Sequence, residues 1–149
     1  MSDTFLIIIP NDPDSETTDE AAEAACLALE VALPKAEEVS YDMFDEVRFI
    51  DPGVAFDVVH CPACGSDADP WWPAAMDKAA QLEFEDLDVV AKCCKAPISL
   101  NDMKYAPAAG FARFAIVITN PEVKDLSDTL IQEVSVVLGC GVRTVRQSA

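Results

Sequence analysis

Two pairs of cysteines are the residues of this sequence whose types and spacing could do chemistry. The first pair lies in Cys61-Pro-Ala-Cys64-Gly65, and the second pair, Cys93 and Cys94, follows further along the chain. A CPxCG run is typical of a zinc knuckle, because its glycine permits a positive φ. Four thiolates complete the tetrahedral shell of a structural Zn²⁺ site. We therefore predict one Zn²⁺ ion bound by Cys61, Cys64, Cys93 and Cys94.

The second pair leaves alternatives open. Adjacent side chains in an extended strand point to opposite sides, so Cys93 and Cys94 can both bind one ion only if the chain turns between them. Three cysteines with His60, or with a water molecule, are the alternatives. A metal-free remnant and a redox dithiol also stay open, although a redox CxxC is typical of a helix start. Cys26 and Cys140 are predicted to be buried as small apolar residues.

The predicted zinc ion is structural. Four thiolates leave no open coordination position and make zinc a poor Lewis acid. The chain has one histidine, which lies beside the first cysteine pair, and its five glycines form no phosphate-binding loop. We therefore predict a non-enzymatic zinc-binding protein that acts as a protein-interaction module. A zinc- or thiol-dependent enzyme is an alternative.

Two continuous apolar runs predict the central strands of a sheet. Residues 5–9 are Phe-Leu-Ile-Ile-Ile, and residues 114–118 are Phe-Ala-Ile-Val-Ile. Strands that are apolar on both faces are typical of positions in the middle of a sheet. Residues 39–43 and 142–146 alternate apolar and polar side chains, so we expect them at the edges.

A helix is predicted after each apolar strand. Thr17 and Glu20 have capping-box spacing, which predicts a helix that starts there and ends before Pro34. A second helix is predicted over residues 125–138, with Gly139 as its left-handed cap. The predicted buried residues of the first helix are Ala22, Ala25, Cys26, Leu29, Ala32 and Leu33. Those of the second helix are Leu126, Leu130, Val134, Val137 and Leu138.

Two such strand–helix–strand units predict an α+β fold, a ferredoxin-like split βαβ sheet. The sheet and its helices are expected from residues 1–45 and 109–149, with a zinc-ribbon-like segment inserted at residues 46–108. The two central strands are apolar on both faces, so the face without helices should also be covered. Either the inserted segment or another subunit could cover it, which makes a homodimer one expectation.

The inserted segment should deliver the cysteines from short strands. Residues 47–50 and 55–59 are predicted to form a hairpin around Asp51-Pro52-Gly53, with the first cysteine pair at its end. Residues 70–82 predict a short helix capped by Asp67 or Asp69. Residues 87–90 predict a strand that leads to the second pair.

The segment from residue 44 to 121 resembles a family of uncharacterised bacterial proteins with the pattern CPxCG, WW, CC, SLND and GFARF. The matching residues are Cys61–Gly65, Trp71–Trp72, Met76–Asp77, Phe84–Leu87, Cys93–Cys94, Ser99–Asp102, Tyr105 and Gly110–Phe114. The resemblance implies that the four cysteines form one cluster in the folded protein. The chain departs from the family pattern at Lys95, where the family has glycine.

The same pattern includes residues that no metal site needs. Asn101 and Asp102 predict a turn whose side chains bond the backbone. Arg113 is expected to pair with Asp102. Trp71 and Trp72 are expected to pack in a core over the inserted helix, and a binding hot spot is the alternative.

The chain is strongly acidic. Its net charge is −17, and residues 1–60 hold 15 acidic side chains against two basic ones. Counterion release opposes the docking of such a surface on nucleic acid, so we expect no nucleic-acid binding. The acidity favours solubility, and the alternative function is an acidic immunity- or inhibitor-type protein that binds a basic partner.

The first residues predict where the protein works. The apolar run at residues 5–9 is too short for a signal peptide or a membrane span. We therefore expect a cytoplasmic protein without membrane contact, in which cysteines stay reduced unless a metal binds them.

Overall fold

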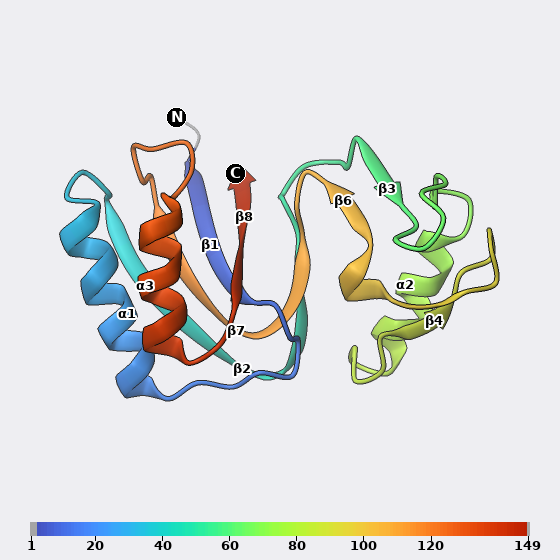
Figure 1. The fold of residues 1–149 in the computed structure, drawn as a ribbon, viewed down its shortest axis with the longest axis horizontal. Helices are drawn as coiled ribbons and strands as arrows, with labels where there is room; N and C mark the ends of the chain where they lie inside the picture. Colours follow the sequence, from blue (N-terminus) through green and yellow to red (C-terminus); the bar gives the residue numbers. More distant parts are fainter. Residues whose placement is uncertain (1–2, 149) are drawn as a thin grey trace.

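The protein, in a computed structural model that describes residues 3–148, has two lobes that lie side by side (Figure 1). The first lobe is a four-stranded antiparallel sheet with two helices, α1 and α3, on one face. The second lobe contains α2 and two-stranded sheets. Within the described residues the protein therefore mixes α and β structure, with three α-helices and a four-stranded antiparallel sheet. None of the helices in residues 3–148 is long and apolar enough to cross a membrane.

The four strands of the first lobe lie in the order β2-β7-β1-β8, and each neighbouring pair is antiparallel. The two apolar runs belong to β1 (Thr4–Pro10) and β7 (Gly110–Thr119), which hold the central positions as predicted. The alternating runs belong to β2 (Glu38–Ile50) and β8 (Val142–Ser148), which form the edges. Burial of both faces of a central strand explains why its pattern is continuously apolar.

The two helices of the first lobe begin later than predicted. Helix α1 (Asp19–Ala32) is capped by Thr18, whose side-chain oxygen accepts a hydrogen bond from the Ala21 amide at 3.1 Å, so the prediction of Thr17 as cap is wrong. Helix α3 (Asp128–Leu138) is capped by Ser127 in the same way. Gly139 follows with φ +76°, which confirms the predicted left-handed cap.

The main core lies between these helices and the sheet. Its buried residues come from both helices, both central strands and the loop before α3: Leu6, Ile8, Ala25, Cys26, Leu29, Phe114, Ile116, Ile118, Leu126, Leu130, Val134 and Leu138. Two residues predicted to be buried are exposed, Ala32 and Val137. Both lie in the last turn of their helix.

The predicted hairpin of residues 47–50 and 55–59 is wrong. Residues 47–50 instead continue β2, and Arg48, Phe49 and Ile50 lie opposite residues of β7. The register shifts between Met43 and Arg48, and such a bulge breaks the alternation by which an uninterrupted strand is recognised. The short strand β3 (Val58–His60) pairs with β6 (Lys104–Ala106).

The second lobe has its own core. Helix α2 (Trp72–Gln81) begins after Trp71 and has no side-chain cap; Asp67 instead accepts a hydrogen bond from the Asp69 amide. A hairpin of β4 (Asp88–Val90) and β5 (Pro97–Ser99) leads into a short 3₁₀ helix, η1 (Leu100–Asp102). The buried residues of this core are Val47, Val59, Cys61, Ala68, Trp71, Ala79, Leu87, Ala91, Leu100, Met103 and Phe111.

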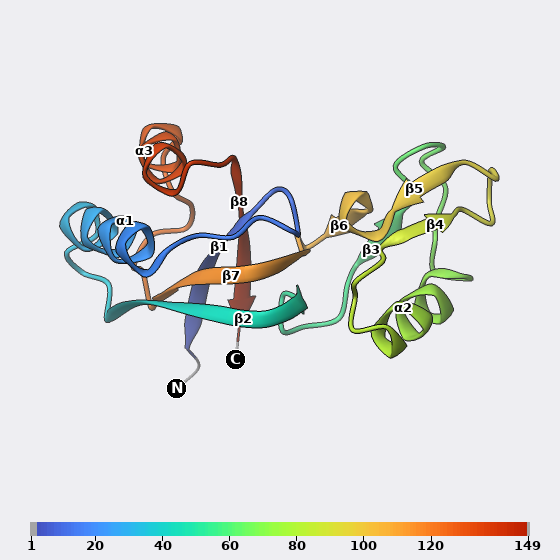
Figure 2. The same cartoon turned by 90° about the horizontal axis from the view of Figure 1, so that it is seen from below.

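The second face of the main sheet is apolar and shallowly hollowed. Ile7, Ile9, Ala115 and Val145 are buried on this face, and the hollow beside them has a volume of about 250 Å³. In Figure 2 both helices lie on the opposite face, and the second lobe lies beside the sheet. The inserted segment therefore does not cover this face, and its cover by a second subunit stays a prediction.

Candidate metal centre

The first cysteine pair lies in a tight turn after β3. The Cys61 amide donates to the Ser66 carbonyl at 2.9 Å, and the Gly65 amide donates to the Cys61 carbonyl at 2.9 Å. Gly65 has φ +77°, a left-handed conformation that glycine adopts without strain. This turn is the predicted knuckle.

The second pair lies in a turn with the same backbone hydrogen bonds. The Ala91 amide donates to the Ala96 carbonyl at 2.9 Å, and the Lys95 amide donates to the Ala91 carbonyl at 2.8 Å. Lys95 has φ +64°, so it takes the left-handed position that Gly65 takes in the first turn. The absence of glycine therefore does not prevent the second knuckle.

The two knuckles present their cysteines from different positions. Cys94 occupies the position of Cys64, whereas Ala91 occupies the position of Cys61 and is fully buried. The fourth sulfur comes from Cys93 instead. Because residues 92–94 form a turn and not a strand, the objection that adjacent side chains point to opposite sides does not apply here.

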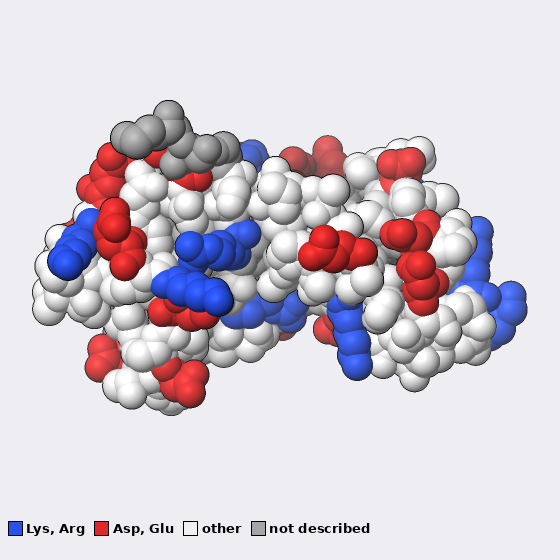
Figure 3. Space-filling view, turned by 90° about the horizontal axis from the view of Figure 1, so that it is seen from above, with Lys and Arg blue, Asp and Glu red and all other residues white. Residues whose placement is uncertain are grey.

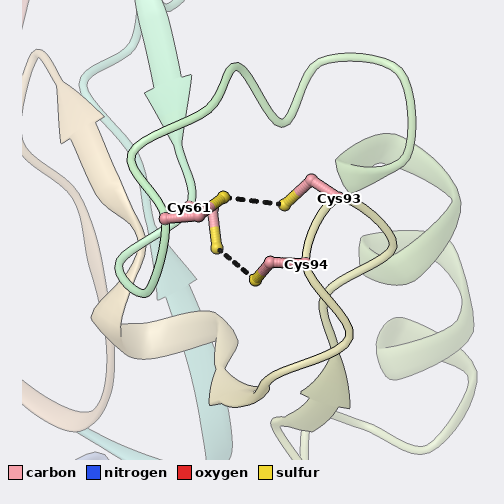
Figure 4. A group of neighbouring side chains, drawn as sticks. Cys61, Cys93 and Cys94 are labelled. Carbon is pink, nitrogen blue, oxygen red and sulfur yellow. Dashed lines mark hydrogen bonds between the residues drawn. The ribbon is translucent and has the colours of Figure 1, made fainter.

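The four sulfur atoms converge on one point between the knuckles. All four lie within 4.8 Å of one another, with 3.9 Å between the sulfurs of Cys61 and Cys94 and 3.3 Å between those of Cys64 and Cys93. Figure 4 shows the side chains of Cys61, Cys93 and Cys94 pointing toward one another from two loops. A tetrahedral ion with Zn–S bonds of about 2.3 Å places its sulfurs roughly 3.8 Å apart. The four cysteines could therefore hold a metal ion.

The chemistry of the cluster is purely thiol. All four cysteines are free of disulfide bonds. His60, the alternative ligand, is the last residue of β3 and is not part of the cluster among the residues that the structure describes. A site of four soft sulfur donors favours Zn²⁺ or another thiophilic metal over Mg²⁺ or Ca²⁺.

The surroundings of the cluster differ between its two sides. Cys61 is fully buried in the core of the second lobe, whereas Cys64 and Cys93 are exposed. Lys92 and Lys95 flank the second pair, and Figure 3 shows basic side chains at the outer end of this lobe. Four thiolates with one divalent ion carry a net charge of about −2, which positive charge nearby stabilises.

The thiols of the cluster perturb one another's pKa values. Hydrogen bonds from the side chain and backbone of Ser66, and a weaker one from Cys93, lower the pKa of Cys64 to about 6. Loss of hydration, followed by hydrogen bonding to Cys64, raises the pKa of Cys93 to about 12. Two thiolates this close repel each other, so ionisation of a second cysteine is unfavourable. A divalent cation between the cysteines would stabilise all four thiolates.

The remaining two cysteines lie in the first lobe. Cys26 is buried in the main core as predicted, and burial there raises its pKa to about 11. Cys140 is only partly buried and packs against the same core. Neither belongs to the cluster of four.

Both tryptophans contribute to the second lobe. Trp71 is 6% exposed and lies in its core. The indole N–H of Trp72 donates to the Tyr105 hydroxyl at 3.2 Å, and that hydroxyl donates to the Leu100 carbonyl at 2.7 Å. The expectation that Trp71 and Trp72 pack in the core is therefore confirmed.

Asn101 connects the two lobes, a role that the sequence pattern did not predict. It is 3% exposed, donates to the Asn11 carbonyl at 2.8 Å and accepts from the Phe111 amide at 3.0 Å. The predicted pair of Arg113 with Asp102 is wrong. Arg113 instead lies 4.0 Å from the Asp14 carboxylate, which is distant in sequence.

Comparison with known proteins adds no relative. No protein-family model, no curated protein and no solved structure matches the chain.

Proposed function

We propose that this is a non-enzymatic zinc-binding protein whose structural Zn²⁺ is held by Cys61, Cys64, Cys93 and Cys94. The observation that carries the proposal is the convergence of four sulfurs, 3.3–4.8 Å apart, from two knuckles of the same backbone geometry. The spacing suits a tetrahedral ion, and four thiolates leave no position for a substrate. The family resemblance of the cysteine pattern supports the same set.

The ion would join two parts of the second lobe. The first knuckle extends from the β3–β6 pair, and the second extends from the β4–β5 pair. These pairs belong to separate sheets and share no ladder hydrogen bonds. A bound metal adds its binding free energy to the folding of such a small unit. A role in holding the lobe together follows.

The strand order β2-β7-β1-β8, with α1 and α3 on one face, supports our proposal of a ferredoxin-like core from residues 1–45 and 109–149. We propose that residues 46–108 are a zinc-ribbon-like insertion, with β2 extending into its first residues. We also propose a cytoplasmic location, since reduced thiols persist there.

Metal analysis of the purified protein tests the proposal. We expect one zinc per chain by elemental analysis and by native mass spectrometry, which also reports the number of subunits. A Cys61→Ser/Cys94→Ser variant should lose the metal, and the control Cys140→Ser should keep it. Protein that is purified with reducing agent and zinc, yet binds no metal, would exclude the proposed site. A visible charge-transfer band would assign iron instead of zinc.

A thiol-dependent reaction is the second candidate. The exposure of Cys64 and Cys93, the 3.3 Å between their sulfurs and the low pKa of Cys64 favour it. The structural site and the redox dithiol can be distinguished by zinc content and by reactivity of the thiols. A structural site keeps zinc and resists alkylation, whereas a redox dithiol reduces disulfide substrates and loses that activity in Cys64→Ser.

A further inference from the structure

The outer surface of the two helices in the first lobe carries exposed apolar side chains. On α1, Leu27 is 62% exposed and Val31 is 83% exposed, and on α3, Val136 is 70% exposed. Single exposed apolar residues are ordinary on a protein surface. The two helices that carry these residues lie side by side on one face of the sheet (Figures 1 and 2).

A groove lies between the helices at this surface. Its volume is about 690 Å³. It is lined by Ala28 of α1 and by six residues of α3: Asp128, Thr129, Gln132, Glu133, Val136 and Val137. The lining is mainly apolar, as the docking site of an amphipathic helix must be.

The charged side chains that line this groove are both acidic, Asp128 and Glu133. Helices α1 and α3 contain no Lys or Arg. They contain six acidic residues: Asp19, Glu20, Glu23, Glu30, Asp128 and Glu133. An apolar groove with a rim of one charge is complementary to a ligand with an apolar face and the opposite charge.

We propose that the groove between α1 and α3 binds a basic amphipathic helix of a partner protein. Apolar side chains at helical spacing would pack on Val136 and Val137, and flanking Lys or Arg side chains would lie near Asp128 and Glu133. A second copy of this chain does not fit, because the same acidic rims would face each other. This surface is separate from the metal centre and does not depend on it.

Two designed peptides test the charge preference. Both are 18 residues long with leucines at the same helical positions; one carries lysines elsewhere and the other carries glutamates. We expect the leucine–lysine peptide to bind the zinc-loaded full chain at low salt and to bind at least tenfold more weakly at high salt. The leucine–glutamate peptide should not bind. Equal binding of the two peptides would overturn the proposal.

Matched variants test the place of binding. Val136→Ser/Val137→Ser should weaken binding of the leucine–lysine peptide at least tenfold, and so should Asp128→Asn/Glu133→Gln. The controls Val90→Ser and Glu85→Gln change exposed residues of the second lobe and should leave binding unchanged. Control variants that weaken binding as much as the groove variants would overturn the proposal, as would a homodimer that the groove variants dissociate.

Discussion

Lys95 and Gly65 occupy the same position of two matching turns. Each has a left-handed backbone, with φ +64° and +77°, and each donates its amide to the carbonyl four residues earlier. Only glycine adopts this conformation without a steric cost. The second knuckle therefore contains local strain that the first does not.

Lys95→Gly should stabilise the zinc-loaded protein by about 1 kcal/mol, because the left-handed conformation costs a non-glycine residue roughly that much. Gly65→Ala should destabilise it by a similar amount. An added methyl group at Gly65 meets no atom within 4 Å, so the cost there is backbone strain alone. Urea unfolding at constant zinc measures both changes. The control Lys92→Gly, at a position without positive φ, should not stabilise, and equal effects at 92 and 95 would contradict the argument.

Removal of zinc should unfold the second lobe before the first. Both tryptophans, Trp71 and Trp72, lie in that lobe and report on it alone. Addition of a strong chelator should shift their fluorescence to longer wavelength, while most of the helical circular dichroism from α1 and α3 remains. Zinc should restore the fluorescence in the wild type and in Cys140→Ser, but not in Cys61→Ser. Fluorescence that a chelator leaves unchanged in demonstrably metal-free protein would show that the ion does not hold the lobe.

Asn101→Ala should destabilise the protein strongly. The substitution leaves the buried Phe111 amide without its partner and removes one of the two donors to the Asn11 carbonyl, at a cost of about 2 kcal/mol. Because Asn101 joins the lobes, its loss should also separate their unfolding into two transitions. Denaturation followed by tryptophan fluorescence and by circular dichroism measures this. The neighbouring control Asp102→Ala, at an exposed position, should leave one transition at almost the same midpoint.

The parts of the structure that the sequence predicted depend on local patterns. The apolar runs identify β1 and β7 because a central strand buries both faces. The four cysteines can be grouped because they occur as two close pairs, and thiolate pairs are typical ligands of a structural zinc ion. Local patterns also placed the helices to within a few residues.

The parts that could not be predicted depend on contacts between distant residues. The bulge between Met43 and Arg48 exists because β7 pairs with both halves of β2. The partner of Arg113 is Asp14, which only the folded chain brings near. The positive φ of Lys95 could not be predicted from the residue type, because lysine seldom adopts a positive φ.

Tyr105 should make stability fall at alkaline pH. Burial raises the pKa of Tyr105 well above its usual value near 10, so in this range the folded state keeps a proton that the unfolded state releases. The stabilisation is complete below pH 10 and is lost as the pH rises above it, by about 1.4 kcal/mol per pH unit. Tyr105→Phe lacks this dependence.

The variant distinguishes the proton from the hydrogen bond. At pH 8, Tyr105→Phe should be less stable than the wild type by about 1 kcal/mol, because the bond to the Leu100 carbonyl is lost. Above pH 10 the difference should shrink and then reverse, because only the wild type loses stability through this hydroxyl. The free energy of unfolding of both proteins is measured in urea at each pH. In the difference between the two values, the contributions of all titrating groups that the proteins share cancel. A difference that stays constant from pH 8 to pH 11 would show that Tyr105 ionises as easily in the folded protein as in the unfolded chain.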